Sequence, residues 1–385
     1  MDVQQYFDPV DFPSYSGKSG ESWTGSLGQM IEKSMLKLAS GGFQDVEIAI
    51  IGVPCDNGDW QKKSAKAPDK IREELYRLTD WEDSLPVIDF GNLKFNNQKG
   101  VALALRDIIE YLDELQVTTV VLGGSEDLSF GICEAFKNHP FFSLTVIDSV
   151  LDIKKSDKET SNSSNHLTRI FNSNPNLFQF SLLGYQSHFV SQQHFKKISG
   201  TGNHLRLGIL RDELLQAEPI LRNSHVALFD IAAVKYAEAP GTHTVNPNGL
   251  RSEEACQLAS YAGMSETLKV FGLFGVKPDK DNNNLTIKLS AQIVWYFLDG
   301  CRNRSEKNKD FLIDKLTFRV EVKNLDKPLI FYFSEVTNRW WFEIQSINGE
   351  KYILACSEKD YLQASNNEIP ELWLKYIQKI DDFSK

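Results

Sequence analysis

Several common signals of function are absent from this 385-residue chain. Its five cysteines form no C-x-x-C pair, which argues against a zinc knuckle or a disulfide framework. No G-x-G-x-x-G or H-E-x-x-H motif occurs, so dinucleotide binding and zinc-protease chemistry lack support. The net charge of −10 disfavours nucleic acid and anionic membranes as partners. Without a membrane-length apolar run or an apolar signal segment, we expect a cytoplasmic protein with no membrane span.

The order of the predicted elements indicates an α/β fold. Continuous apolar runs typical of buried strands alternate with amphipathic patterns typical of helices. The predicted strands cover 46–54, 85–91, 118–124, 143–149, 225–231 and 270–276. Such alternation predicts a mostly parallel sheet with helices on both faces. Ligands of these sheets bind at the carboxyl ends of the strands.

By pattern, the chain divides into three parts. Residues 1–45 are predicted to be an irregular lead-in, 46–309 the α/β domain, and 310–385 a small appended α+β module. In the module, Trp340 and Trp341 are adjacent and must face opposite sides of a strand. At least one could form an exposed docking surface for a protein partner. Alternatively, both pack, one of them against the main domain.

Acidic residues gather at the ends of three predicted strands. Glu126 and its neighbour follow one strand, Asp148 and Asp152 follow another, and Asp230 ends a third. Any one of these could simply cap the next helix. Carboxylates that meet at one sheet edge repel one another unless a cation or protons neutralise them, so together they favour a site. The seven histidines are scattered and none adjoins a strand-end aspartate, so we interpret them as surface or satisfied polar residues.

Ordered motifs between about residues 46 and 300 make the chain resemble the ureohydrolase family of arginase, agmatinase and formimidoylglutamase. "GGSEDLS" stands where the family has Gly-Gly-Asp-His-Ser, "DSVLD" where it has Asp-Ala-His-x-Asp, and "FDIAAVKYAEAPGT" where it has Phe-Asp-x-Asp-x-x-Asp-Pro followed by Ala-Pro-Gly-Thr. The overall pattern is most similar to formimidoylglutamase. The resemblance implies a three-layer arginase-like fold whose strand ends hold two manganese ions that activate a water for hydrolysis.

Position by position, the chain departs from the family's chemistry. Glu126 and Val150 stand where the family has metal histidines, Ala232 and Lys235 where it has aspartates, and Gly275 where it has a glutamate that binds the cationic substrate head. The unchanged metal ligands are Asp148, Asp152 and Asp230. The resemblance therefore leaves Lys235, Gly275 and the nearby His243 in a vestigial cleft with no confident catalytic residue.

The remaining residues limit the metal content. The set Glu126, Asp148, Asp152 and Asp230 suits at most one hard ion, Mn²⁺, Mg²⁺ or Ca²⁺. Val150 and Ala232 cannot ligate, so a second ion should be absent. The alternative is no metal at all, with the ammonium group of Lys235 neutralising the carboxylates. Equally, Lys235 could point to solvent.

Two functions remain open at this point. The first is a pseudoenzyme that binds a protein partner or self-associates, with a homo-oligomer left open. The second is a hydrolase of a formimino- or guanidino-type C–N bond that uses a single ion.

Overall fold

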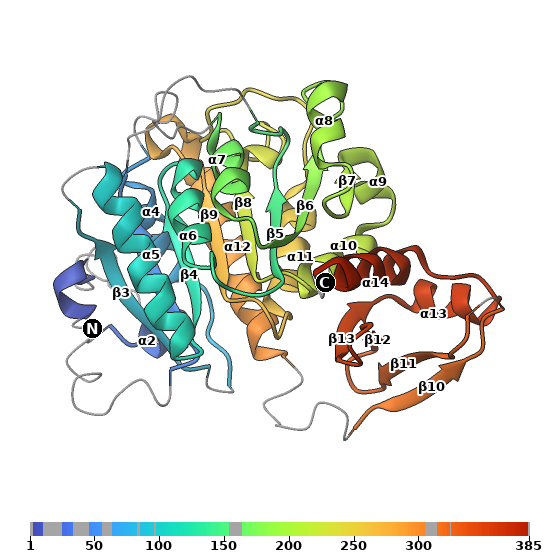
Figure 1. Ribbon diagram of the computed structural model, residues 1–385. Coiled ribbons are helices and arrows are strands. Elements are labelled where there is room, and N and C mark those ends of the chain that lie inside the picture. The colour runs from blue at the N-terminus through green and yellow to red at the C-terminus, as the bar shows by residue number, and fades with distance from the viewer. Residues whose placement is uncertain are drawn as a thin grey trace.

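The computed structural model describes residues 3–10, 25–33, 46–55, 64–82, 85–95, 98–153, 164–304, 314–323 and 325–383. Its larger part is built on one sheet (Figure 1). The strands are β1 (Phe7–Asp8), β2 (Ile48–Val53), β3 (Val87–Leu93), β4 (Thr118–Gly123), β5 (Phe142–Ile147), β6 (Leu177–Tyr185), β7 (His204–Arg206), β8 (Val226–Asp230) and β9 (Val270–Phe274). They lie in the order β1-β3-β2-β4-β9-β8-β5-β6-β7. Neighbours are parallel except β1 with β3, so the predicted mostly parallel sheet is confirmed.

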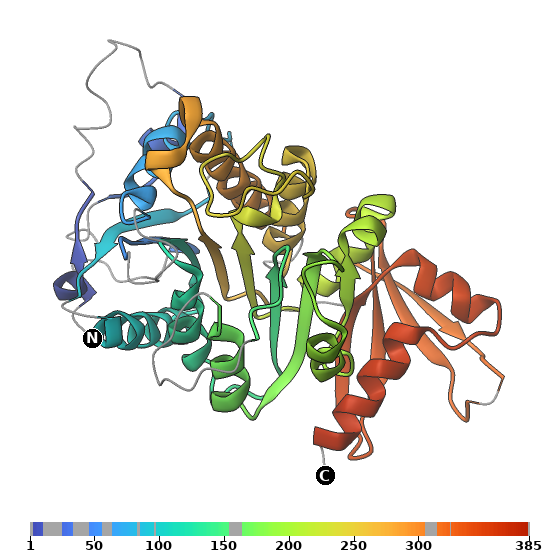
Figure 2. The same ribbon diagram turned by 90° about the horizontal axis from the view of Figure 1, so that it is seen from above.

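Helices cover both faces of this sheet, which gives three layers (Figures 1 and 2). On one face lie α4 (Ala67–Leu75), α11 (Ser252–Gly263) and α12 (Leu285–Arg302), and on the other α5 (Gln98–Glu114), α6 (Ser129–Glu134) and α7 (His166–Ser173). Successive side chains of a strand point to opposite faces. Accordingly, Ile48 and Ile50 join the core beneath the first helices, whereas Ala49 and Ile51 join the core beneath the second.

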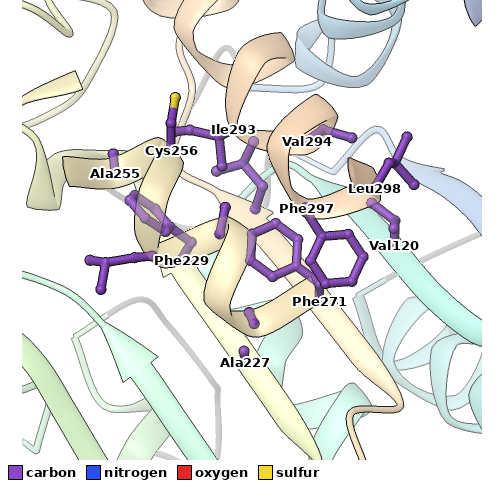
Figure 3. Packing of buried hydrophobic residues seen from close by; sticks show 14 of the residues in the cluster. Val120, Ala227, Phe229, Ala255, Cys256, Phe271, Ile293, Val294, Phe297 and Leu298 are labelled. Carbon is purple, nitrogen blue, oxygen red and sulfur yellow. The ribbon is translucent and has the colours of Figure 1, made fainter. Parts of the chain in front are cut away.

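Aromatic stacking joins the sheet to its helical cover. The rings of Phe271 in β9 and Phe297 in α12 stack at 4.4 Å, among the aliphatic side chains of α12 and the neighbouring strands (Figure 3). Both rings are fully buried. This contact packs α12 against β9.

The remaining elements of the domain are short. They are η1 (Val3–Tyr6), α2 (Leu27–Met30), η2 (Glu126–Leu128), α8 (Gln192–Ile198), α9 (Leu207–Asp212), η3 (Leu214–Gln216), α10 (Ala217–Arg222), η4 (Ile231–Ala233), η5 (Pro278–Lys280) and η6 (Asn282–Asn284). None of the helices in the described ranges combines the length and the apolar character that a membrane-spanning segment requires.

Part of the N-terminal segment is ordered into the domain, although we expected an irregular lead-in. Phe7 of β1 pairs with Leu93 of β3, and its ring stacks on Phe90 at 5.3 Å. Only 1% of Phe7 is exposed. Burial of this one aromatic side chain holds a two-residue edge strand that periodicity cannot reveal.

The C-terminal part is a small α+β unit, as its alternating pattern predicted. Its sheet contains β10 (Leu316–Val320), β11 (Leu329–Ser334), β12 (Arg339–Gln345) and β13 (Lys351–Cys356), all antiparallel, and its helices are α13 (Glu358–Ser365) and α14 (Glu371–Phe383). Figure 2 shows it beside the β6–β7 edge of the main sheet.

Both tryptophans of β12 are buried. Trp340 is 8% exposed and stacks on Tyr361 of α13 at 4.5 Å. Trp341, on the opposite face, is 3% exposed and packs under the Arg222 guanidinium of the main domain. The alternative in which both tryptophans pack is therefore confirmed, and neither forms a docking surface.

Candidate metal centre

Acidic side chains from three strand ends line one cavity of about 470 Å³. Asp148 directly follows β5, Asp230 is the last residue of β8, and Glu126 lies in η2 just after β4. Asp152 lies four residues beyond Asp148 and also lines the cavity. The four carboxylates that the sequence placed together thus meet at the carboxyl edge of the sheet, where parallel α/β folds bind their ligands.

Burial and mutual repulsion raise the pKa values of these carboxyl groups. The pKa of Glu126 is raised well above its usual range by burial and then by the charges of Asp148 and Asp230. The pKa of Asp148 is also raised by burial and by Asp230, although the backbone N–H of Ser149 donates to it at 2.6 Å. Buried carboxylates of one sign require a cation or bound protons, so this cluster favours cation binding.

His166 completes a ligand set that sequence analysis missed. Its Nε2 lies 3.6 Å from Oε1 of Glu126, and both side chains are buried. Ligand atoms of Glu126, Asp152 and His166 all lie within 4.8 Å of one another. Carboxylate and imidazole ligands together suit a divalent ion such as Mn²⁺. These three residues therefore fit a divalent metal ion.

Our interpretation of the histidines as surface or satisfied polar residues did not anticipate that His166 lies buried beside Glu126. This residue opens α7, fourteen positions beyond Asp152 along the chain, so it adjoins no acidic residue in sequence. One available signal was its place at the first turn of an amphipathic helix that follows an acidic strand end. Only the packing of α7 against the sheet brings the imidazole to Glu126.

Two positions of the cavity carry hydrocarbon side chains that cannot bind a metal. Val150 and Ala232 line it beside Asp148 and Asp230. The backbone N–H of Ala232 donates to Oδ1 of Asp230 at 2.7 Å, so this carboxylate oxygen already has a protein partner. The family resemblance implies metal ligands at both of these positions.

Gly275 occupies a position that leaves no room for a side chain. Its φ of +82° favours glycine, and a Cβ built there would lie 2.5 Å from Oδ1 of Asp230. A larger residue at this turn after β9 would have to displace Asp230. Gly275 is thus part of the geometry of the carboxylate cluster.

Lys235 is directed to another partner. Its Nζ lies 2.6 Å from Oε1 of Glu238, and both side chains are 28% exposed. Glu238 also accepts from the Ser252 hydroxyl at 2.6 Å, so Lys235 joins a capping network rather than the cavity lining. A cation whose charge acts on Asp230 is instead Lys277. His243 lines the cavity, and Lys277 is 3% exposed.

Comparison with known proteins places this geometry in a family. Residues 46–299 match the model of the Arginase family, and the chain belongs to it. More particularly, the relatives and solved structures that it resembles include formimidoylglutamases. Formimidoylglutamase of Lysinibacillus sphaericus is 24% identical over 276 residues, which span 66% of this chain and 84% of that protein. The small C-terminal unit lies beyond the matched residues.

Solved structures show the same fold. Formimidoylglutamase from Bacillus subtilis superposes with a TM-score of 0.66 at 17% identity, over 76% of this chain and 96% of that one. Trypanosoma cruzi formiminoglutamase, determined with Mn²⁺, gives 0.63 at 19% identity over 68% and 95%. The resemblance inferred from the motifs is confirmed.

Proposed function

We propose that this protein is a catalytically degenerate member of the family, which uses the scaffold for binding instead of hydrolysis. The observation that carries the proposal is the pair Val150 and Ala232 beside Asp148 and Asp230 in the cavity. Two-metal hydrolysis needs both ions to position and activate one water. Hydrocarbon side chains at two ligand positions remove the second ion and, with it, that mode of activation.

The substrate side of the cavity supports the same proposal. Gly275 contributes no carboxylate. A side chain at this position would clash with Asp230, so a single substitution would not place a carboxylate there without displacing Asp230. A cationic guanidinium or formimino head would therefore lack the anionic partner that the family resemblance implies. The chain's own buried cation, Lys277, adds positive charge near Asp230 and disfavours a cationic substrate further.

We further propose that one divalent ion, Mn²⁺ by preference, binds at Glu126, Asp152 and His166. The ion would act as a Lewis acid and would supply positive charge to the cluster of carboxylates. Glu126 and Asp152 would neutralise it, while His166 would orient it from α7. The Nδ1 atom of His243, which also lines the cavity, is buried with no hydrogen-bond partner in the described part of the chain.

A second candidate is a hydrolase of a formimino- or guanidino-type C–N bond that uses this single ion. The observation that favours it is the recruitment of His166 to Glu126 at 3.6 Å, because a purely vestigial site needs no such ligand. A single ion can still supply Lewis acidity. His243 would then act as the group that accepts or donates a proton.

The two candidates are separated by metal content and turnover measured on the same preparation. After incubation with Mn²⁺ and desalting, the degenerate binder should retain at most one ion and hydrolyse none of arginine, agmatine and formimidoylglutamate. Turnover that depends on one stoichiometric ion would instead establish the hydrolase. Two ions per chain in the wild type would contradict both.

A restoration variant sharpens this experiment. Val150→His with Ala232→Asp returns ligand atoms to both hydrocarbon positions, so bound Mn²⁺ should rise by one ion per chain. Val150→Ala is the matched control and should leave the metal content unchanged. If the double variant gains no ion although it stays folded, the assignment of these two positions to the second shell is wrong.

The binder would act on a protein partner or on a second copy of itself, in the cytoplasm. Because both tryptophans of β12 are buried, this contact would use another surface. Analytical ultracentrifugation of the purified chain tests self-association, since a monomer at all concentrations would leave only a different protein as partner.

A further inference from the structure

A second cavity lies between the main domain and the C-terminal unit. It measures about 320 Å³ and is lined from both sides: Gln179 of β6 and Asn203 near β7 face Lys375, Tyr376 and Lys379 of α14. We call it the seam cavity. Its volume falls at the lower end of the range of ligand pockets, roughly 300–1,000 Å³. It lies apart from the acidic cavity and shares no lining residue with it.

Two lysines one helical turn apart give the seam cavity its charge. Lys375 and Lys379 are at i and i+4 of α14, so they lie on the same side of the helix. Lys375 donates to Oδ1 of Asn203 at 3.2 Å and pairs with the largely exposed Glu371 at 2.8 Å. Among the described residues that line the cavity, none is acidic.

Lys379 is a cation held without a counter-charge. Its ammonium donates to the backbone carbonyl of Phe178 at 2.8 Å and to that of Thr201. Within the described residues, no ion pair joins it to a carboxylate. Burial, followed by repulsion from Lys375, lowers the pKa of Lys379 to about 8. An ammonium that keeps only neutral partners retains most of its attraction for an anion.

Apart from the two lysines, the described residues that line the cavity are uncharged. Burial and then the charges of Lys375 and Lys379 help to lower the pKa of the neighbouring His204 to about 4, so this ring is neutral near pH 7. Asn203 and Gln179 add amide groups that can donate to an oxyanion. Lysine is a common phosphate ligand in proteins, where it acts as a point charge.

We propose that the seam cavity binds a small metabolite through a doubly charged oxyanion, of the phosphate monoester class. Lys375 and Lys379 neutralise the oxyanion, and Asn203 orients it. The cavity exceeds what a free inorganic anion fills, so the remainder of the ligand occupies the space beside Tyr376. Because the lining comes from both parts of the chain, the bound ligand fastens α14 to the β6–β7 edge.

Titration calorimetry of the full chain at constant ionic strength tests the proposal with glycerol phosphate, inorganic phosphate and acetate. We expect saturable binding, tightest for glycerol phosphate and weakest for acetate. Equal affinity for acetate and phosphate would overturn the assignment of a doubly charged ligand. Weaker binding of glycerol phosphate than of inorganic phosphate would overturn the assignment of an ester.

Variants separate this site from general anion effects. Lys379→Met should weaken phosphate binding at least tenfold. The control is Lys351→Met, which should leave phosphate binding unchanged. Lys351 is an exposed residue of β13 that pairs with Glu343. If Lys379→Met does not fold, Lys375→Ala serves, since that side chain is 44% exposed. Phosphate also stabilises proteins non-specifically, so equal binding by the wild type and the lysine variants would overturn the proposal.

Discussion

At the scale of the residue, Gly275 shows how one position both supports the cluster and limits its chemistry. The glycine combines a positive φ with a contact that leaves no room for a Cβ against Asp230. A residue with a side chain therefore meets backbone strain and a steric clash together. Substitution of Gly275 by glutamate alone would therefore displace Asp230.

The first prediction concerns this glycine. Gly275→Ala should lower the free energy of unfolding by about 1–3 kcal/mol, because strained backbone of this kind costs that much. Gly208→Ala is the matched control, since a Cβ at this position of α9 meets nothing within 4 Å. There the change should be neutral or stabilising by up to about 1 kcal/mol. Urea denaturation measures both, and equal stability of the two variants would contradict the argument.

His166 carries the second prediction. His166→Ala should weaken Mn²⁺ binding at least about tenfold, because even loss of an outer-shell partner of a metal site costs 10–100-fold. His194 lines the same cavity but is outside the cluster of ligand atoms, so His194→Ala should bind Mn²⁺ as the wild type does. Calorimetric titration of the metal-free proteins gives both affinities. Unchanged affinity in the His166 variant would remove this residue from the site.

At the scale of the element, a buried ion pair fastens α4 to the sheet. Arg72 donates to both oxygens of Asp89 in β3, at 2.8 and 3.0 Å, and both side chains are fully buried. Tyr76, directly after α4, donates to the same carboxylate at 2.7 Å. Gly52 of β2 leaves the necessary space, since a Cβ there would lie 2.8 Å from the guanidinium. Helix and strand are thus joined by charge inside the core.

The third prediction tests this junction. Arg72→Met should destabilise the protein by about 3–5 kcal/mol, because it leaves the buried Asp89 without its counter-charge. Arg77→Met, at an exposed ion pair with Glu74, should change stability by less than about 1 kcal/mol. Thermal and urea unfolding of both variants gives the comparison. A loss below 1 kcal/mol for Arg72→Met would mean that water or a rearranged side chain compensates Asp89.

Sequence patterns predicted the elements that are buried throughout and missed those that depend on distant partners. The runs that became β2, β4, β5, β8 and β9 were predictable because strands covered on both faces are apolar at every position. By contrast, β1 rests on the single ring of Phe7 against Phe90. The acidic strand ends were also predictable, since topology alone brings them to one edge. His166 and Lys235 were not, because their partners are fixed by how a helix and a loop pack.

At the scale of the whole molecule, the C-terminal unit shares its core with the main domain. Phe178 of β6 belongs to the hydrophobic cluster of that unit, and its ring centroid lies 5.9 Å from that of Tyr376 in α14. On the other face of β12, Trp341 packs under Arg222. The side chain of Asn223 both donates to and accepts from the backbone of Ala355, at 2.9 Å each way. The two parts are therefore expected to unfold together.

Calorimetry of the full chain should consequently show one cooperative transition rather than two, because neither part can lose its structure without exposing the core that it shares. Trp341→Ala should destabilise the whole chain by about 3–5 kcal/mol, as for other large buried aromatic side chains. The control is Val336→Ala, whose side chain is 88% exposed and whose effect should stay within about 0.5 kcal/mol. Two separate transitions in the wild type, with only the second shifted by Trp341→Ala, would show instead that the unit folds independently beside the sheet.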